Sequence, residues 1–233
     1  MNSRQLIGLF NDKGIHVFTL NDVVRMTGVS RDYARLFASR LVNRGVIHRA
    51  IRGHYYTDNA TMMEISSNLL FPSYISLMPA LYYYGFTTQQ SDVMDVITTK
   101  RHKNVITDLG RVKFHTLDVK RMFGYYRTPN NIFVAEPEKA IADSLFLGIP
   151  QYGYVEEAFE RASKRGALNM GKLAAYAEKM QSRTLDKRMN ELKRSIRDTT
   201  PPKNVGQRRQ KKGTQGTKPN HRQHPANLCL RNP

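Results

Sequence analysis

Basic and hydroxyl side chains are concentrated near the N-terminus, between residues 19 and 57. Within eleven residues this segment places Ser30, Arg31, Arg35, Ser39 and Arg40. A guanidinium group can bind a guanine edge or a phosphate through two parallel hydrogen bonds, and a hydroxyl group can bind either of them. These side-chain types therefore point to recognition of duplex DNA, provided that a helix presents them on one face.

The residues around them predict two helices joined by a tight turn. Thr19 begins the first helix, and its hydroxyl with the carboxylate of Asp22 resembles a capping box. Gly28 can adopt the positive φ that the turn needs. Ser30 is placed to cap a second helix over residues 31–43. The order of elements indicates a helix-turn-helix.

The second predicted helix, residues 31–43, is amphipathic. Its apolar stripe consists of Ala34, Phe37, Ala38 and Leu41. The reading residues Ser30, Arg31 and Arg35 would lie at its N-terminal end, while Leu36 falls near the polar face for no reason that the pattern supplies. An ordinary helix with a solvated basic face would show the same pattern. This helix alone therefore does not distinguish a DNA-binding helix from an ordinary amphipathic one.

A basic hairpin follows the helix and favours DNA binding. Two short strands, residues 46–49 and 54–57, flank a turn at residues 50–53. Arg49, Arg52 and His54 could reach backbone phosphates or a minor groove. Residues 1–60 are therefore predicted to form a winged helix-turn-helix domain. Because some winged helices serve only protein contacts, that alternative stays open.

The rest of the chain predicts an α+β fold. Residues 61–198 should form a mixed domain with a small, mainly antiparallel sheet and C-terminal helices. The expected strands are residues 93–99, 104–107, 112–117 and 131–134. The expected helices are residues 61–70, 76–85, 135–147, 154–164, 170–181 and 185–196, with a break at 71–76. In this scheme Ser76 and Asn169 are caps, and Pro137 occupies the first turn of its helix.

The charge supports a polyanionic partner. The chain has 37 basic and 19 acidic residues, for a net charge of +18. Eight of the basic residues, without any acid, lie in residues 199–233, a segment poor in hydrophobic residues that we expect to be a disordered basic tail. That tail could add phosphate contacts or be dispensable. Nucleic acid is favoured over an anionic membrane because the charge coincides with the helix-turn-helix pattern.

Composition excludes several other classes of protein. No apolar run approaches the roughly 18 to 20 residues of a membrane helix. The single cysteine, Cys229, excludes an internal disulfide and a multi-cysteine zinc site. With no pattern typical of a secretory signal, these features predict a cytoplasmic protein that has no membrane partner.

A metal-dependent nuclease is the enzyme class to weigh against DNA binding alone. Carboxylates that could hold Mg²⁺ at a phosphate are Asp95, Asp108, Glu136, Glu138 and Asp143, with Lys139 close by. However, Pro137 suits the start of a helix better than a strand inside a sheet, and the glutamates on either side of it suit the positive end of that helix. With no phosphate-binding or metalloprotease motif, the sequence predicts no metal, no cofactor and no catalysis.

Segments in the middle of the chain resemble one known family. They are residues 72–77 (PSYISL) and 80–85 (ALYYYG), then 96–101 (VITTKR), 123–125 (FGY) and 135–143 (AEPEKAIAD). In this order they are similar to the AbiEi family, the antitoxin and transcriptional-regulator components of abortive-infection (type IV) toxin–antitoxin systems in phage defence. The resemblance covers about residues 5–165, and the tail does not share it.

The resemblance implies a repressor that regulates its own operon. The N-terminal domain would bind an inverted repeat in its own promoter through Ser30, Arg31 and Arg35, with Arg49 and Arg52 on the wing. The C-terminal domain would counter a toxin resembling a nucleotidyltransferase. A protein-interaction antitoxin with little specific DNA binding is the alternative within the same family.

Overall fold

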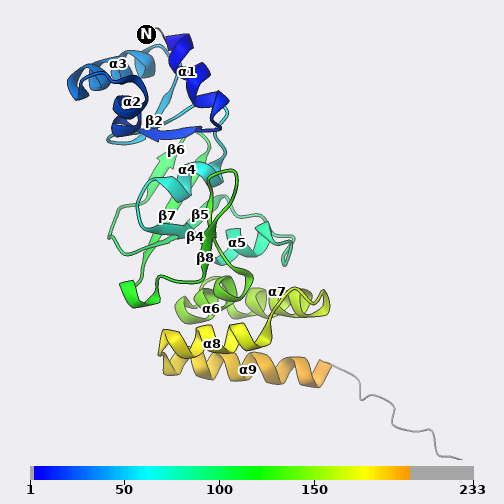
Figure 1. Cartoon of the computed structure of the whole chain (residues 1–233). Coiled ribbons are helices and arrows are strands. Elements are labelled where there is room, and N and C mark those ends of the chain that lie inside the picture. Colours follow the sequence, from blue (N-terminus) through cyan, green and yellow to red (C-terminus); the bar gives the residue numbers. More distant parts are fainter. Residues whose placement is uncertain (1–2, 200–233) are drawn as a thin grey trace, which may run out of the picture. The chain divides into compact units, whose positions relative to one another are not determined.

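The N-terminal elements are three helices and a three-stranded antiparallel sheet (Figure 1). We describe residues 3–199 of a computed structural model, with side chains from residue 5 to 195; they form one compact unit. Of the predicted tail, residues 199–233, all but Thr199 lie outside the described residues, and Thr199 ends a helix instead. Here the elements are α1 (Ser3–Asp12), β1 (Val17–Thr19), α2 (Leu20–Thr27), α3 (Arg31–Asn43), β2 (His48–Ile51) and β3 (His54–Tyr56), with strand order β1-β3-β2.

Local signals set the ends of α2 and α3. The Thr19 hydroxyl accepts a hydrogen bond from the Asp22 amide at 3.3 Å, and the Asp22 carboxylate accepts one from the Thr19 amide at 2.8 Å, so the predicted capping box is complete. Gly28 ends α2 with φ of 70°, where a side chain would be strained. The hydroxyl of Ser30 accepts from the amide of Tyr33 at 3.3 Å and caps α3.

The buried faces of these helices form a hydrophobic cluster of their own. Phe10 and Phe18 stack at its centre with ring centroids 4.3 Å apart. Its fully buried members are Leu6, Phe10, Phe18, Val23, Ala34, Ala38, Leu41, Ile47 and Tyr55. Of the apolar stripe predicted for α3, Ala34, Ala38 and Leu41 are buried, whereas Phe37 is only partly buried. This packing fixes which face of α3 points outward.

The basic hairpin is present, but its turn is shorter than predicted. The first strand begins at His48 rather than Val46 and continues through Ile51, so only Arg52 and Gly53 remain in the turn. Gly53 has φ of 81°, and the pairing of β2 with β3 shifts register between Arg49 and Ile51. A bulge of this kind lets one strand accommodate an extra residue.

A second, six-stranded sheet forms the centre of the rest of this unit. Its strands, in spatial order, are β6 (Val105–Thr107), β7 (Gly110–Thr116), β5 (Val93–Thr98), β4 (Ser73–Ile75), β9 (Phe133–Ala135) and β8 (Tyr125–Arg127). The α+β class is confirmed. Three of its five strand pairings are antiparallel, as the sequence predicts, while β5 with β7 and β4 with β9 pair in parallel, so the sheet is mixed.

Two strands of this sheet were not predicted. The segment at residues 71–76, expected only to break a helix, contains β4, which pairs with β5 on one side and β9 on the other. Its three residues are all buried, so no alternation of polar and apolar residues marks it. Strand β8 is equally short and lies at the sheet edge.

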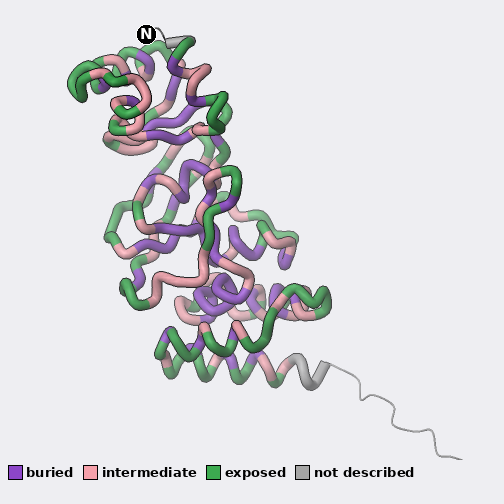
Figure 2. The backbone as a smooth tube through the Cα atoms, viewed as in Figure 1, coloured by how far each residue is buried: buried purple, intermediate pink, exposed green. Residues whose placement is uncertain are grey.

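Helices cover this sheet and extend beyond it. They are α4 (Met62–Asn68), α5 (Leu77–Tyr83), the 3-10 turn η1 (Val119–Arg121), α6 (Pro137–Leu147), α7 (Tyr152–Lys164), α8 (Met170–Met180) and α9 (Arg183–Thr199). Helix α6 contacts β9, α5, α7, α8 and α9 and is buried along most of its length, whereas α8 and α9 expose their outer faces (Figure 2). Pro137 is the first residue of α6, and the side chain of Asn169 caps α8, as the sequence predicts.

Histidine–carboxylate pairs join the N-terminal elements to the larger sheet. His16 lies 2.8 Å from the Glu64 carboxylate of α4. His48 on β2 lies 2.8 Å from Asp58 and 3.1 Å from Asp108, which is in the turn between β6 and β7. Val17 and Tyr56 also belong to the larger hydrophobic cluster. The N-terminal elements are therefore packed against the sheet rather than linked to it only by the chain.

Among the helices of residues 3–199, none combines the length and the apolar character that crossing a membrane requires.

Candidate nucleic-acid interface

Four predicted DNA-contacting arginines line one groove. Arg31 and Arg35 come from the first two turns of α3, Arg49 comes from β2, and Arg52 comes from the hairpin turn. The groove has a volume of about 410 Å³, and Leu20, Gly53 and Tyr55 complete its lining. All four arginines are exposed. The fold thus gathers side chains from α3 and the hairpin into a single basic surface.

The charge of this groove is largely uncompensated. Arg35 lies 3.9 Å from Asp32, whose side chain is 94% exposed, so water screens that pair strongly. Within residues 5–195, Arg31, Arg49 and Arg52 form no ion pair. Clustered cations without acidic partners attract polyanions such as the DNA backbone.

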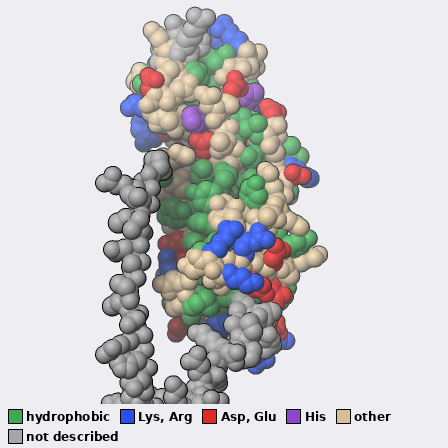
Figure 3. Space-filling view, turned by 90° about the vertical axis from the view of Figure 1, so that its right-hand side faces the viewer, with side chains coloured by type: hydrophobic (Ala, Val, Ile, Leu, Met, Phe, Trp, Pro, Cys, Tyr) green, Lys and Arg blue, Asp and Glu red, His purple; other side chains and the backbone are tan. Residues whose placement is uncertain are grey.

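Some basic side chains elsewhere in the described unit are paired with acids. On α7, Arg161 lies 2.8 Å from Glu157 and Lys164 lies 3.2 Å from Glu160. Figure 3 shows basic and acidic side chains side by side over the lower part of the unit. What marks the arginine groove is that four exposed arginines, from α3 and the hairpin, line it together.

The remaining predicted residues on α3 do not line the groove. The hydroxyl of Ser30 is occupied in capping the helix, although the residue itself is exposed. Ser39 and Arg40 are exposed one to two turns further along α3. Leu20 and Tyr55, which were not predicted, contribute apolar surface to the groove. Only the pairing of strands could have revealed Tyr55, because it is 20 residues from Arg35 in the sequence.

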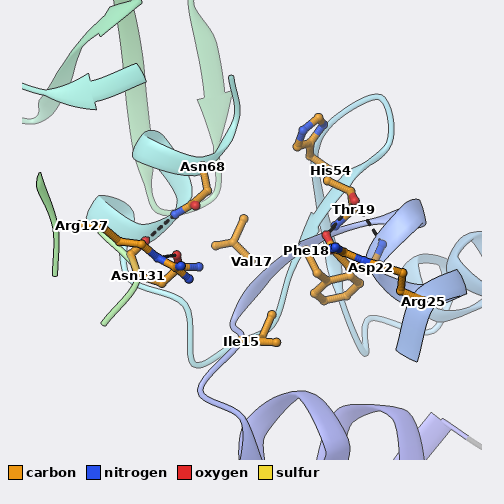
Figure 4. A pocket seen from close by; sticks show the side chains of 10 residues that line it. All are labelled: Ile15, Val17, Phe18, Thr19, Asp22, Arg25, His54, Asn68, Arg127 and Asn131. Atoms are coloured by element: carbon orange, nitrogen blue, oxygen red, sulfur yellow. Dashed lines mark hydrogen bonds and ion pairs between the residues drawn. The ribbon is translucent and has the colours of Figure 1, made fainter. Parts of the chain in front are cut away.

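His54 lies in a different place from the arginines. It lines a second pocket of about 310 Å³ together with Thr19, Asp22 and Arg25 (Figure 4). The other side of this pocket includes Arg127 of β8, Asn131 of the turn between β8 and β9, and Asn68 of α4. Successive residues of a strand point to opposite faces, so Tyr55 faces the arginine groove and its neighbour His54 faces away. The prediction from sequence placed His54 with Arg49 and Arg52 because it did not take this alternation of side chains into account.

Burial governs the chemistry of His54. It lowers the pKa of the imidazole below its usual value of 6.5, and the Nδ1 atom is buried without a hydrogen-bond partner. In the same pocket, the hydrogen bonds from Thr19 and Arg25 outweigh the effect of burial and lower the pKa of Asp22. His54 is thus favoured in its neutral form, which makes it a poor phosphate ligand.

The carboxylates weighed for a nuclease are dispersed among structural partners. Asp95 pairs with His115 at 2.7 Å, and Asp108 pairs with His48. Glu136 accepts a hydrogen bond from Tyr176, and Glu138 accepts one from the Asn169 amide at 2.8 Å. No group of three or more histidine, cysteine or acidic residues able to hold a metal occurs in the part of the chain that is described.

Lys139 and Asp143 form an ion pair in the core beside the six-stranded sheet, and both side chains are 0% exposed. The second carboxylate oxygen of Asp143 accepts hydrogen bonds from Ser76 at 2.9 Å and Tyr74 at 3.1 Å. The sequence predicts that the side chain of Ser76 caps α5, and this is wrong: the hydroxyl makes no cap hydrogen bond and donates to Asp143 instead. Burial raises the pKa of Asp143, and the ammonium group of Lys139 with the two hydroxyls offsets part of that shift.

These four residues come from two of the segments that carry the family resemblance. Tyr74 and Ser76 belong to PSYISL, and Lys139 and Asp143 belong to AEPEKAIAD. A third segment, FGY, supplies Phe123, whose ring lies 4.7 Å from the Lys139 ammonium. These segments thus contain a buried polar cluster that connects β4 and the start of α5 to α6.

No protein-family model matches this chain, and a search of curated proteins finds no match to it. The resemblance to the AbiEi family therefore rests on the sequence segments quoted above.

Proposed function

We propose that residues 1–60 form a winged helix-turn-helix that binds duplex DNA. Helix α3 would lie in the major groove with Arg31 and Arg35 at base edges or phosphates, and Arg49 and Arg52 of the hairpin would hold the adjacent backbone. The observation that carries this proposal is the convergence of these four exposed arginines on one groove.

The rest of the proposal follows from the resemblance. The chain acts as a sequence-specific transcriptional repressor of its own promoter. It also serves as the antitoxin against a partner resembling a nucleotidyltransferase in a phage-defence operon. The dispersed carboxylates favour this role over that of a nuclease, because Mg²⁺ at a phosphate needs clustered acids. The proposal contains no catalytic step.

The deciding experiment compares two DNA targets at physiological salt. The full chain is titrated against the DNA upstream of its own gene and against random DNA of equal length. We expect a clear preference for the upstream DNA; equal affinity for both would refute the repressor. Arg31→Ala or Arg35→Ala, if at a base contact, should cost about 1 to 3 kcal/mol and relax the choice of sequence.

A phosphate contact gives a different signature. Arg52→Ala should weaken binding to all sequences and reduce the slope of log K against log salt by about 0.9. Between 50 and 200 mM salt that change is worth about 3.5-fold per phosphate. Arg161→Ala on α7 is the control, because it removes a partly exposed arginine that lies outside the groove and is paired with Glu157. If the slope of log K against log salt is the same in Arg52→Ala as in the wild type, Arg52 does not contact a phosphate.

The antitoxin role is tested separately by co-expression with the neighbouring toxin gene. A chain with Arg49→Ala and Arg52→Ala should still neutralise the toxin, since neither residue lies in residues 61–198. Loss of neutralisation with the folded variant would show that toxin control acts only through DNA binding.

A further inference from the structure

Leu36 occupies an outward position on α3 that packing does not explain. Its side chain is 50% exposed and belongs to neither hydrophobic cluster of the described residues. At about 100° per residue, it lies about 160° around the helix from both Ala34 and Ala38, whose side chains are buried. Leu36 thus points away from the domain core.

Three of the four helix-surface neighbours of Leu36 are polar. Asp32 lies four residues before it, and Ser39 and Arg40 lie three and four residues after it; all three are exposed. The fourth neighbour, Tyr33, is 43% exposed, and its ring stacks on Phe37 with ring centroids 6.0 Å apart. Leu36 is therefore an exposed aliphatic side chain bordered mainly by polar residues.

We infer that Leu36 recognises the 5-methyl group of a thymine in the major groove. This inference rests on the proposed DNA binding, since it needs α3 to lie in that groove. Thymine is the one base of unmodified DNA that presents a methyl group there, and an apolar side chain on the recognition helix is its complement. The arginines on one side supply affinity and register, while Leu36 supplies a preference for thymine at one or two positions of the site.

The test replaces thymine by deoxyuridine, which removes only the methyl group. The binding site is first selected from random DNA with the full-length chain, and each thymine of the selected site is then replaced in turn. At the position read by Leu36, the wild type should lose about fourfold in affinity, equivalent to about 0.8 kcal/mol for one buried carbon. Leu36→Ala should bind the thymine and deoxyuridine sites equally.

Controls separate the possible failures. Val119→Ala, which truncates a 73% exposed side chain in η1, should keep the fourfold response of the wild type, and Leu36→Met should retain most of it. The inference is wrong if the chain binds its site specifically but loses no affinity when any thymine is replaced by deoxyuridine. It is also wrong if Leu36→Ala loses as much affinity as the wild type. Either result would still be compatible with the proposed repressor. If Leu36→Ala changes the sedimentation of the free chain but not its DNA binding, Leu36 contacts a second copy and the inference fails. If no sequence is selected, the proposed function itself fails.

Discussion

Replacing Asp143 by asparagine should destabilise the folded unit severely. The substitution keeps the size of the side chain but removes the negative charge beside the Lys139 ammonium, which is 0% exposed. The surroundings that remain are the sulfur of Met180 at 3.8 Å and the rings of Phe123 and Tyr74, at 4.7 and 5.8 Å from the ammonium. None of these neutralises a full charge.

The magnitude follows from the cost of an uncompensated buried charge. Breaking a buried pair in this way costs about 3 to 5 kcal/mol. A domain of this kind has roughly 5 to 15 kcal/mol of stability in total. For a unit of nearly 200 residues we therefore expect a fall in melting temperature of about 6 to 20 °C.

The assay is urea unfolding followed by circular dichroism, with the single and double variants compared. Lys139→Met should cost less than Asp143→Asn, because Asp143 keeps its hydrogen bonds from Ser76 and Tyr74 and can accept a proton. Burial raises the folded-state pKa of Asp143, and loss of Lys139 removes a group that lowers it. A group with a raised folded-state pKa contributes most stability at low pH, so the deficit of Lys139→Met should shrink as the pH falls through that pKa.

The double variant Lys139→Met with Asp143→Asn tests the reasoning directly. It removes both charges and leaves the amide oxygen of Asn to accept from Ser76 or Tyr74. We expect it to recover most of the stability lost in Asp143→Asn. If Asp143→Asn costs less than about 1 kcal/mol, or if the double variant is no more stable than Asp143→Asn, the account of this core in terms of a buried charge is wrong.

Two further predictions concern the N-terminal elements. Asp32→Asn should strengthen binding to all DNA sequences by roughly threefold, because it removes an exposed negative charge beside Arg35; a titration at several salt concentrations measures this, and weaker binding would instead indicate that Asp32 accepts a hydrogen bond from a base. Burial lowers the folded-state pKa of His54, so its contribution to stability is present above pH 6.5 and is lost as the pH falls through the lowered pKa. His54→Gln should therefore flatten the fall in unfolding free energy below pH 6.5, and an unchanged pH profile would contradict the burial of His54.

Elements with local signals could be predicted from the sequence. The bounds of α3, the capping box at Thr19, the positive φ of Gly28 and the first position of Pro137 all depend on residues within one or two turns of each other. Short buried strands such as β4 could not, because three residues buried on both faces carry no alternating pattern. The part played by Ser76 was missed for a related reason, since its partner Asp143 is 67 residues away.

The sequence by itself determined the composition of the candidate interface: a basic helix followed by a basic hairpin. Only the tertiary structure decided which of those residues meet. Pairing of β2 with β3 brings Arg49 and Arg52 to the same groove as Arg31 and Arg35, and the alternation of side chains along β3 turns His54 to the opposite face. The tertiary structure also decided that Leu36 points outward, because the burial of Ala34 and Ala38 fixes the rotation of α3 about its axis. Helix propensity and capping depend on neighbours in the chain, whereas a shared surface depends on packing between residues far apart in sequence.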